Sequence, residues 1–127
     1  MTLIPPPPRR SFQARVDDWI QHCFGFEIGA YKMERNHRFL EEALELVQAG
    51  GCTASEAHQL VDYVFGRPVG EMHQEVGGVM VTLAALCNAH GVDLDAAAET
   101  ELRRVWVKSG QIRAKQAAKP KHSPLPA

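Results

Sequence analysis

The sequence predicts an all-α protein, an antiparallel bundle of about five helices that dimerisation would complete. Three observations predict it: apolar residues recur at helical spacing, Ser, Thr and Asp stand where helices would begin, and no segment sustains the alternation of a strand. The expected loops are short, which favours antiparallel neighbours. A domain of this size buries only about two-thirds of its chain surface, so a second copy would add to a limited core.

Capping residues and glycines set the expected helix boundaries. Ser11 can cap the first helix, and Thr53 with Glu56 has the pattern of a capping box. Asp93 can cap the last helix, and Gly91 ends the one before it. The five helices are expected over residues 11–24, 32–49, 53–65 and 71–90, and from 93 into a basic C-terminal arm, with Gly25 and Gly29 interrupting the chain after the first.

Three segments are expected along the chain. Residues 1–10 contain Pro5 to Pro8 and favour an extended, polyproline-like arm. Residues 11–117 form the helical domain. Residues 118–127 are basic and rich in proline, a composition typical of a disordered tail.

Charge is distributed unevenly over the chain. Residues 1–102 hold 7 Lys and Arg against all 15 Asp and Glu, a net charge of −8, whereas residues 103–127 carry +7. No segment approaches the ~18 apolar residues of a membrane helix, and no secretory signal is visible. The 3 cysteines lack metal-ligand spacing. We therefore expect a cytoplasmic protein without a membrane partner.

Two carboxylates lie one turn apart on the second expected helix. Glu42 and Glu45 stand at positions i and i+3 on its polar face. One interpretation is a solvated face on which Arg38 pairs with its acidic neighbours. The alternative is a site that binds a cation.

Glu75 stands near the start of the most apolar expected helix. A helix this apolar should be largely buried, and a buried carboxylate is costly unless it is paired, protonated or bound to a cation. Glu42 and Glu45 are like charges, so packing them against Glu75 requires a cation between them. Mg²⁺ or Mn²⁺ fits oxygen ligands. The alternative partner of Glu75 is an arginine, Arg38 or Arg67.

These motifs resemble those of a known family. Glu42-Ala43-Leu44-Glu45 on one helix, followed by Glu75-Val76-Gly77-Gly78 opening an apolar helix, is similar to the pattern of the MazG-type nucleoside triphosphate pyrophosphohydrolases. These enzymes belong to the all-α NTP pyrophosphatase superfamily, whose pattern is Glu-x-x-Glu and then Glu-x-x-Asp. The resemblance covers roughly residues 12–117.

The resemblance implies a Mg²⁺-dependent enzyme. It would hydrolyse a (d)NTP or related nucleotide between the α- and β-phosphates, giving the monophosphate and pyrophosphate. Glu42, Glu45 and Glu75 would be the catalytic residues and metal ligands. Glu41 and His37 would lie beside them, although a surface or capping role is the alternative for His37. The resemblance also implies a homodimer or a dimer of dimers.

One position departs from the family pattern. Gly78 stands where the family has its aspartate ligand, and Glu71, one turn before Glu75, is a candidate substitute. The departure supports an alternative function, that of a catalytically weakened member that binds nucleotide or protein. Two consecutive glycines in a helix also need a reason, and we expect a helix or ligand close to Gly77 and Gly78.

The basic C-terminal helix supplies candidates for phosphate binding. Arg104 and Lys108 lie one turn apart and correspond loosely to a phosphate-binding region of the family. The alternative is a basic helix end that complements its own dipole. Nucleic acid is not the expected partner, because only Trp106 interleaves with the basic residues and no known motif is visible. Trp19 and Trp106 are expected in the core or in an interface.

Overall fold

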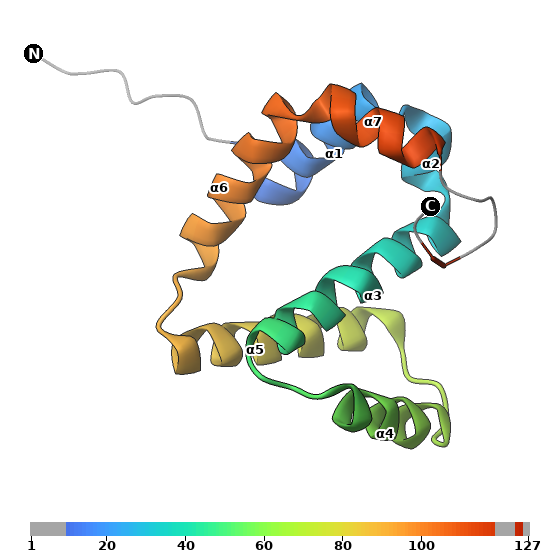
Figure 1. The fold of residues 1–127 in the computed structure, drawn as a ribbon, viewed down its shortest axis with the longest axis vertical. Helices are drawn as coiled ribbons and strands as arrows, with labels where there is room; N and C mark the ends of the chain where they lie inside the picture. Colours follow the sequence, from blue (N-terminus) through green and yellow to red (C-terminus); the bar gives the residue numbers. More distant parts are fainter. Residues whose placement is uncertain (1–9, 119–123, 126–127) are drawn as a thin grey trace, which may run out of the picture. The chain divides into compact units, whose positions relative to one another are not determined.

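The computed structural model describes residues 10–118 and 124–125. These residues form helices and contain no strand (Figure 1), so the predicted all-α fold class is confirmed. The helices are α1 (Phe12–Cys23), α2 (Phe26–Ala30), α3 (Lys32–Ala49), α4 (Ala54–Phe65), α5 (Met72–His90), α6 (Leu94–Val107) and α7 (Ser109–Ala117). The predicted N-terminal arm, apart from Arg10, and most of the predicted C-terminal tail lie outside the described residues.

Side chains cap the helices at the predicted positions. At the start of α1 the Oγ of Ser11 accepts a hydrogen bond from the backbone N–H three residues on, at 3.1 Å. At α4 the Oγ1 of Thr53 accepts from the N–H of Glu56 at 3.2 Å, and the Oε1 of Glu56 accepts from the N–H of Thr53 at 2.8 Å. At α6 the Oδ1 of Asp93 accepts an N–H at 2.8 Å. These contacts satisfy donors that have no partner within the helix.

Glycines in the left-handed region end two of the helices. Gly51, two residues after the end of α3, has a φ of +96°, and Gly91, which follows α5, has a φ of +66°. A residue with a Cβ adopts such a backbone at a cost, so glycine is favoured at both positions. The predicted ends of these helices are therefore confirmed.

The short helix α2 occupies the segment that two glycines were expected to interrupt. Gly25 precedes it with a φ of +84°, but Gly29 lies inside the helix. A Cβ on Gly29 would lie 2.7 Å from the Cγ2 of Ile20 on α1. Glycine therefore allows α2 to pack closely against α1, and the expectation that Gly29 interrupts the chain was wrong.

The last expected helix is divided in two. Lys108 has φ −98° and ψ 15°, and it separates α6 from α7. Next to this break the hydroxyl of Ser109 donates to the carbonyl of Val105 at 3.0 Å. A side-chain bond of this kind competes with the backbone bonds that would continue the helix.

The helices belong to two compact units. The terminal unit comprises Met1–His37 and Arg104–Ala127, and the central unit comprises Arg38–Arg103. The boundary between them falls inside α3 and inside α6. Among the described residues, no single helix is long and apolar enough to cross a membrane, whereas α5 and α6, bent by 100°, meet that criterion only as a pair.

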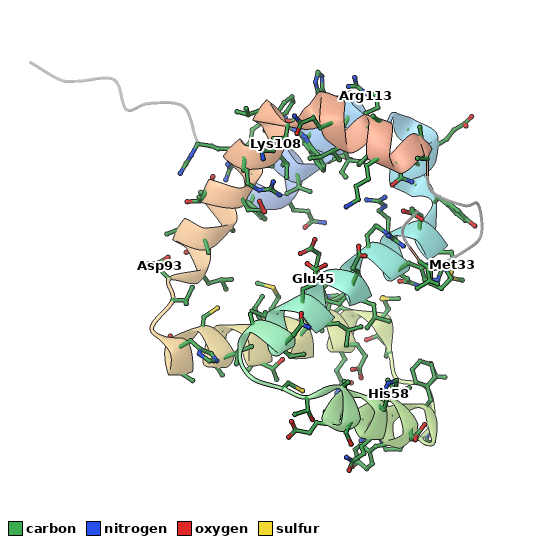
Figure 2. All side chains as sticks on the ribbon, in the orientation of Figure 1. Met33, Glu45, His58, Asp93, Lys108 and Arg113 are labelled. Carbon is green, nitrogen blue, oxygen red and sulfur yellow. The ribbon has the colours of Figure 1, made fainter. Side chains whose placement is uncertain are left out.

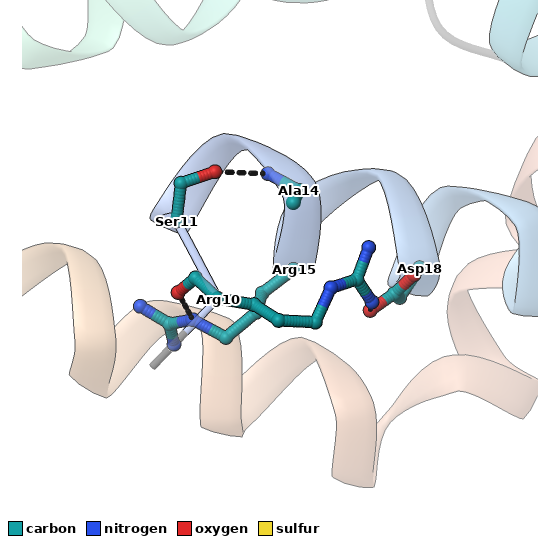
Figure 3. A network of polar contacts seen from close by, with 5 residues as sticks. All are labelled: Arg10, Ser11, Ala14, Arg15 and Asp18. Atoms are coloured by element: carbon teal, nitrogen blue, oxygen red, sulfur yellow. Dashed lines mark hydrogen bonds and ion pairs between the residues drawn. The ribbon is translucent and has the colours of Figure 1, made fainter. Parts of the chain in front are cut away.

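The terminal unit is built on α1. This helix contacts both α2 and α7, and it buries Trp19 and Cys23. Ser109 is buried in the same unit. At the start of α1, Arg10 forms an ion pair with Asp18, and the Nε of Arg15 donates to the carbonyl of Arg10 at 3.1 Å (Figure 3). Residues from the two ends of the described chain thus share one small core.

The central unit has almost no buried side chains. Leu102 is buried in it, whereas every residue from 58 to 82 is exposed. The C-terminal ends of α3 and α5 do approach each other, since a Cβ on Gly50 would lie 3.2 Å from the Nε2 of His90. The expectation that α5 is largely buried was wrong for the single chain, because nothing in the described part of the chain covers its N-terminal half.

Candidate functional site

The first pair of candidate residues lies on α3. Glu42 and Glu45 are both exposed and are separated by one turn of the helix; Figure 2 labels Glu45. Glu41, on the same turn, forms an ion pair with Arg38, whose Nη1 lies 3.4 Å from its Oε1. Arg38 is therefore bound to a carboxylate of its own helix, as in the interpretation of a solvated charged face. The polar face of α3 remains accessible at Glu42 and Glu45.

Glu75 lies in the first turn of α5 and is exposed. Its side chain folds back over the preceding loop, so that a Cβ on Gly70 would meet its Oε1 at 2.5 Å. An exposed carboxylate keeps its hydration, so burial does not force Glu75 to bind a cation. The prediction that Glu75 needs a partner because its helix is buried was therefore wrong for the single chain.

Glu71 caps α5 instead of standing free on its surface. Its Oε1 accepts from the backbone N–H of His73 at 2.9 Å, and its Oε2 accepts from that of Gln74 at 2.8 Å. These two hydrogen bonds hold the pKa of Glu71 below its ordinary value. Both oxygens that would approach a metal already accept hydrogen bonds from the helix. The sequence did not indicate this role, because glutamate is not among the usual N-cap residues.

Gly77 and Gly78 have open space beside them. Apart from the surrounding turns of α5, no described residue has an atom within 4 Å of a Cβ at either position. Residues 10–118 and 124–125 therefore do not supply the close neighbour expected at these glycines. The Oγ1 of Thr82, one turn further along α5, donates to the carbonyl of Gly78 at 2.8 Å. This side-chain bond adds to the backbone hydrogen bond that the same carbonyl accepts within the helix.

The candidate metal ligands belong to one unit. Glu42, Glu45 and Glu75 all belong to the central unit, and their carboxylates are the oxygen ligands that Mg²⁺ prefers. Within residues 10–118 and 124–125, however, no group of three or more His, Cys, Asp or Glu side chains is placed to share a metal ion. The assignment of Glu42, Glu45 and Glu75 as metal ligands therefore stays a prediction.

The candidate phosphate-binding residues belong to the other unit. Arg104 and Lys108 are exposed in the terminal unit, at the end of α6 and directly after it. His37 also belongs to the terminal unit. The structure describes the two units separately, so the phosphate-binding and neighbouring roles of these residues stay predictions.

Arg113 has a structural role that the sequence did not indicate. Its Nε donates to the carbonyl of Cys23 at 2.8 Å, and its Nη2 donates to that of His22 at 3.1 Å. Arg113 extends from α7 (Figure 2) and so satisfies carbonyls at the C-terminal end of α1 that have no helical donor. Part of the basic charge of the C-terminal segment therefore stabilises the fold.

The two tryptophans differ in their surroundings. Trp19 is buried, as predicted for a core residue, and Trp106 is partly exposed with its ring centroid 4.8 Å from that of His22. Burial also raises the pKa of the neighbouring Cys23 thiol, which keeps this cysteine protonated and unreactive. The core of the terminal unit is thus a packing element without an activated nucleophile.

Comparisons with protein-family models, with curated proteins and with solved structures find no match for the chain. The resemblance to the MazG-type enzymes therefore stays a prediction from the residues that carry it. The proposal for the function of the chain rests on those residues and on where the structure places them.

Proposed function

We propose that the chain is a Mg²⁺-dependent nucleotide pyrophosphohydrolase that converts a (d)NTP or a related nucleotide to the monophosphate and pyrophosphate. In this reaction the oxygen of a water molecule bonds to the α-phosphorus. The bond from that phosphorus to the bridging oxygen breaks, and pyrophosphate leaves with the bridging oxygen. A carboxylate is suited to take the proton that the attacking water loses.

The observation that carries the proposal is the accessibility of three carboxylates in one unit. Glu42 and Glu45 on α3 and Glu75 on α5 are all exposed within the central unit. A nucleotide brings its own phosphate charge, and the Mg²⁺ or Mn²⁺ that accompanies it, when bound, supplies neutralisation of that charge. Exposed carboxylates can reach such a ligand, whereas buried carboxylates could not.

A second function is favoured by the residues around Glu75. Gly78 lacks the carboxylate that the resemblance predicts, and Glu71 uses both of its oxygens to cap α5. A chain with these features could bind nucleotide or protein without efficient hydrolysis. The second candidate is therefore a catalytically weakened member of the same family, acting as a binding module.

A nucleotide panel tests the enzymatic proposal. The purified chain is incubated with (d)NTPs and Mg²⁺ or Mn²⁺, and the release of pyrophosphate and monophosphate is measured. We expect the release of pyrophosphate to depend on the metal ion. Glu45→Gln should lower the rate of release on the order of a hundredfold, because the loss of a charged metal ligand weakens the neutralisation of phosphate charge by the metal. Glu27→Gln, a change of the same kind at an exposed residue of α2, should leave the rate unchanged.

The variant Gly78→Asp separates the two candidates. Apart from the surrounding turns of α5, no described residue has an atom within 4 Å of a Cβ at this position, so the Cβ of an aspartate fits without a clash. If the natural chain binds nucleotide in calorimetry without turnover, and Gly78→Asp gains turnover, the weakened binding module is the correct function. If neither protein binds or hydrolyses any nucleotide, the enzymatic function and the nucleotide-binding form of the second candidate are both wrong.

A further inference from the structure

The central unit carries a strongly negative charge, although its proposed substrate is an anion. Over Arg38–Arg103 the chain has 3 Arg and no Lys against 11 Asp and Glu, a net charge of −8. This charge repels the phosphates of a nucleotide, and one divalent cation offsets only part of the repulsion. A unit that binds a nucleotide through its carboxylates therefore needs a cationic side chain of its own beside them.

Two of the three arginines of the central unit are poorly placed for this role. The Nη1 of Arg38 lies 3.4 Å from the Oε1 of Glu41, so this guanidinium is already bound to a carboxylate of its own helix. The Nη2 of Arg103 donates to the Oγ1 of Thr100 at 3.4 Å within α6, a helix that carries none of the candidate metal ligands. The remaining arginine is Arg67, between α4 and α5.

The guanidinium of Arg67 is held over the ring of Tyr63. Its Cζ lies 4.2 Å from the ring centroid, and its Nη1 lies 3.5 Å from the phenolic oxygen. A cation in this position is attracted to the negative face of the ring, which restricts the side chain. Arg67 is exposed, and within the described part of the chain no carboxylate lies within ion-pair distance of it. Its charge is therefore available to a ligand.

Arg67 and Glu75 border the same loop. Residues 66–71 connect α4 to α5 (Figure 1), and the carboxylate of Glu75 folds back onto this connection at Gly70. The Cα atoms of Arg67 and Gly70 are three residues apart, so they are separated by at most about 11 Å. A ligand with the length of a triphosphate chain can therefore contact both the long side chain of Arg67 and the carboxylate of Glu75.

We propose that Arg67, positioned by Tyr63, binds the β- and γ-phosphates of the nucleotide, the part that leaves as pyrophosphate. This inference rests on the proposed function, and it places a phosphate-binding residue in the unit that holds the carboxylates, unlike Arg104 and Lys108. A guanidinium can donate two parallel hydrogen bonds to phosphate oxygens. Negative charge develops on the leaving group as the bond to the bridging oxygen breaks, and Arg67 stabilises that charge.

Calorimetric titration of the full chain with inorganic pyrophosphate and Mg²⁺ tests this assignment without requiring turnover. Arg67→Met removes the charge and keeps an unbranched stem, so it should weaken pyrophosphate binding roughly tenfold to a hundredfold. Arg67→Lys keeps the charge but not the fork and should recover part of the loss. Arg103→Met removes the same charge at an exposed position of the same unit and should leave the affinity unchanged. Equal losses in the two Met variants would overturn the proposal, because only the net charge of the unit would then matter.

Two further measurements separate phosphate binding from a structural role of Arg67. Tyr63→Leu removes the ring that positions the guanidinium and should weaken pyrophosphate binding roughly threefold, whereas Tyr63→Phe keeps the ring and should bind as the natural chain does. The urea midpoint of Arg67→Met should stay near that of the natural chain, because the side chain is exposed. A lowered midpoint with unchanged pyrophosphate affinity would instead assign Arg67 to stabilising the C-terminal end of α4 and would overturn the proposal.

The hydrolysis assay distinguishes a failure of this inference from a failure of the enzymatic function. If the natural chain hydrolyses a nucleotide and Arg67→Met keeps both kcat/KM and the affinity for pyrophosphate, only the assignment of Arg67 is wrong. If the natural chain binds pyrophosphate, Arg67→Met weakens that binding and no nucleotide is hydrolysed, the assignment stands and the enzymatic function is wrong. A natural chain that binds no pyrophosphate in the presence of Mg²⁺ would overturn the assignment.

Discussion

The indole Nε1 of Trp19 donates a hydrogen bond to the Oγ of Ser109 at 3.1 Å, and both residues are buried. The same N–H also lies 3.1 Å from the carbonyl of Val105. Through this pair, α1 is joined to the start of α7, although the residues are far apart in the sequence. The break between α6 and α7 thus coincides with the polar contact at the centre of the terminal unit.

The contribution of this contact can be measured by removing either partner. Ser109→Ala should lower the free energy of unfolding by about 1 kcal/mol, because Trp19 keeps the carbonyl of Val105 as an acceptor. Trp19→Phe should lower it by roughly 2 kcal/mol or more, because it leaves a cavity and removes the indole N–H that Ser109 and Val105 accept from. Urea unfolding followed by circular dichroism measures both changes. Ser55→Ala, at an exposed position of α4, should stay within about 0.5 kcal/mol of the natural chain.

Arg113 should stabilise the C-terminal end of α1 through its forked donors. Arg113→Met removes both hydrogen bonds to the carbonyls of His22 and Cys23 and should cost roughly 1–2 kcal/mol in the free energy of unfolding. Arg113→Lys keeps the charge but not the fork, so it should recover only part of the loss. Lys115→Met, which removes the same charge two residues further along α7, is the matched control. An equal loss in the two Met variants would show that only net charge matters.

The capping box of α4 should make stability depend on acid pH. The N–H and Oγ1 of Thr53 donate to Glu56 at 2.8 and 3.0 Å, and these bonds hold the pKa of the Glu56 carboxyl below its ordinary value. A lowered pKa means that the ionised carboxylate stabilises the folded state above the ordinary pKa of glutamate, near 4.3. This stabilisation is lost as the pH falls through the lowered value.

NMR titration of the Glu56 carboxyl measures this effect directly. In Thr53→Ala the side-chain donor is lost, so the pKa of Glu56 should rise toward its ordinary value. The difference in unfolding free energy between the natural chain and Glu56→Gln should shrink as the pH is lowered from neutral into the acid range. A pKa of Glu56 that is identical in the natural chain and in Thr53→Ala would contradict the role of the box.

Helix boundaries could be predicted from the sequence because they depend on local contacts. The caps at Ser11, Thr53 and Asp93 bond to backbone groups three residues away, and Gly91 ends α5 through its own backbone conformation. The short helix α2 could not be predicted in the same way. It depends on the contact between Gly29 and Ile20, and no local pattern indicates that a glycine supports helix packing there.

Burial and the convergence of side chains could not be predicted from the sequence. Periodicity shows that α5 is apolar, but it does not show what covers the helix, and residues such as Val76 are exposed in the single chain. The spacing of Glu42 and Glu45 on one helix follows from local geometry. Their position relative to Glu75 depends on how α3 packs near α5, which no local pattern in the sequence determines.

Glu71 should act as a helix cap, and a comparison of two variants separates that role from metal binding. Glu71→Ala removes the acceptors for the N–H groups of His73 and Gln74, so the urea midpoint should fall. Glu71→Ser removes the charge but keeps a hydroxyl that can cap the helix, so its midpoint should stay near that of the natural chain. If Glu71 only caps α5, Glu71→Ser also keeps the affinity for Mg²⁺ measured by calorimetry. Loss of Mg²⁺ affinity in Glu71→Ser, with its midpoint unchanged, would instead assign Glu71 to the metal in place of the carboxylate absent at Gly78.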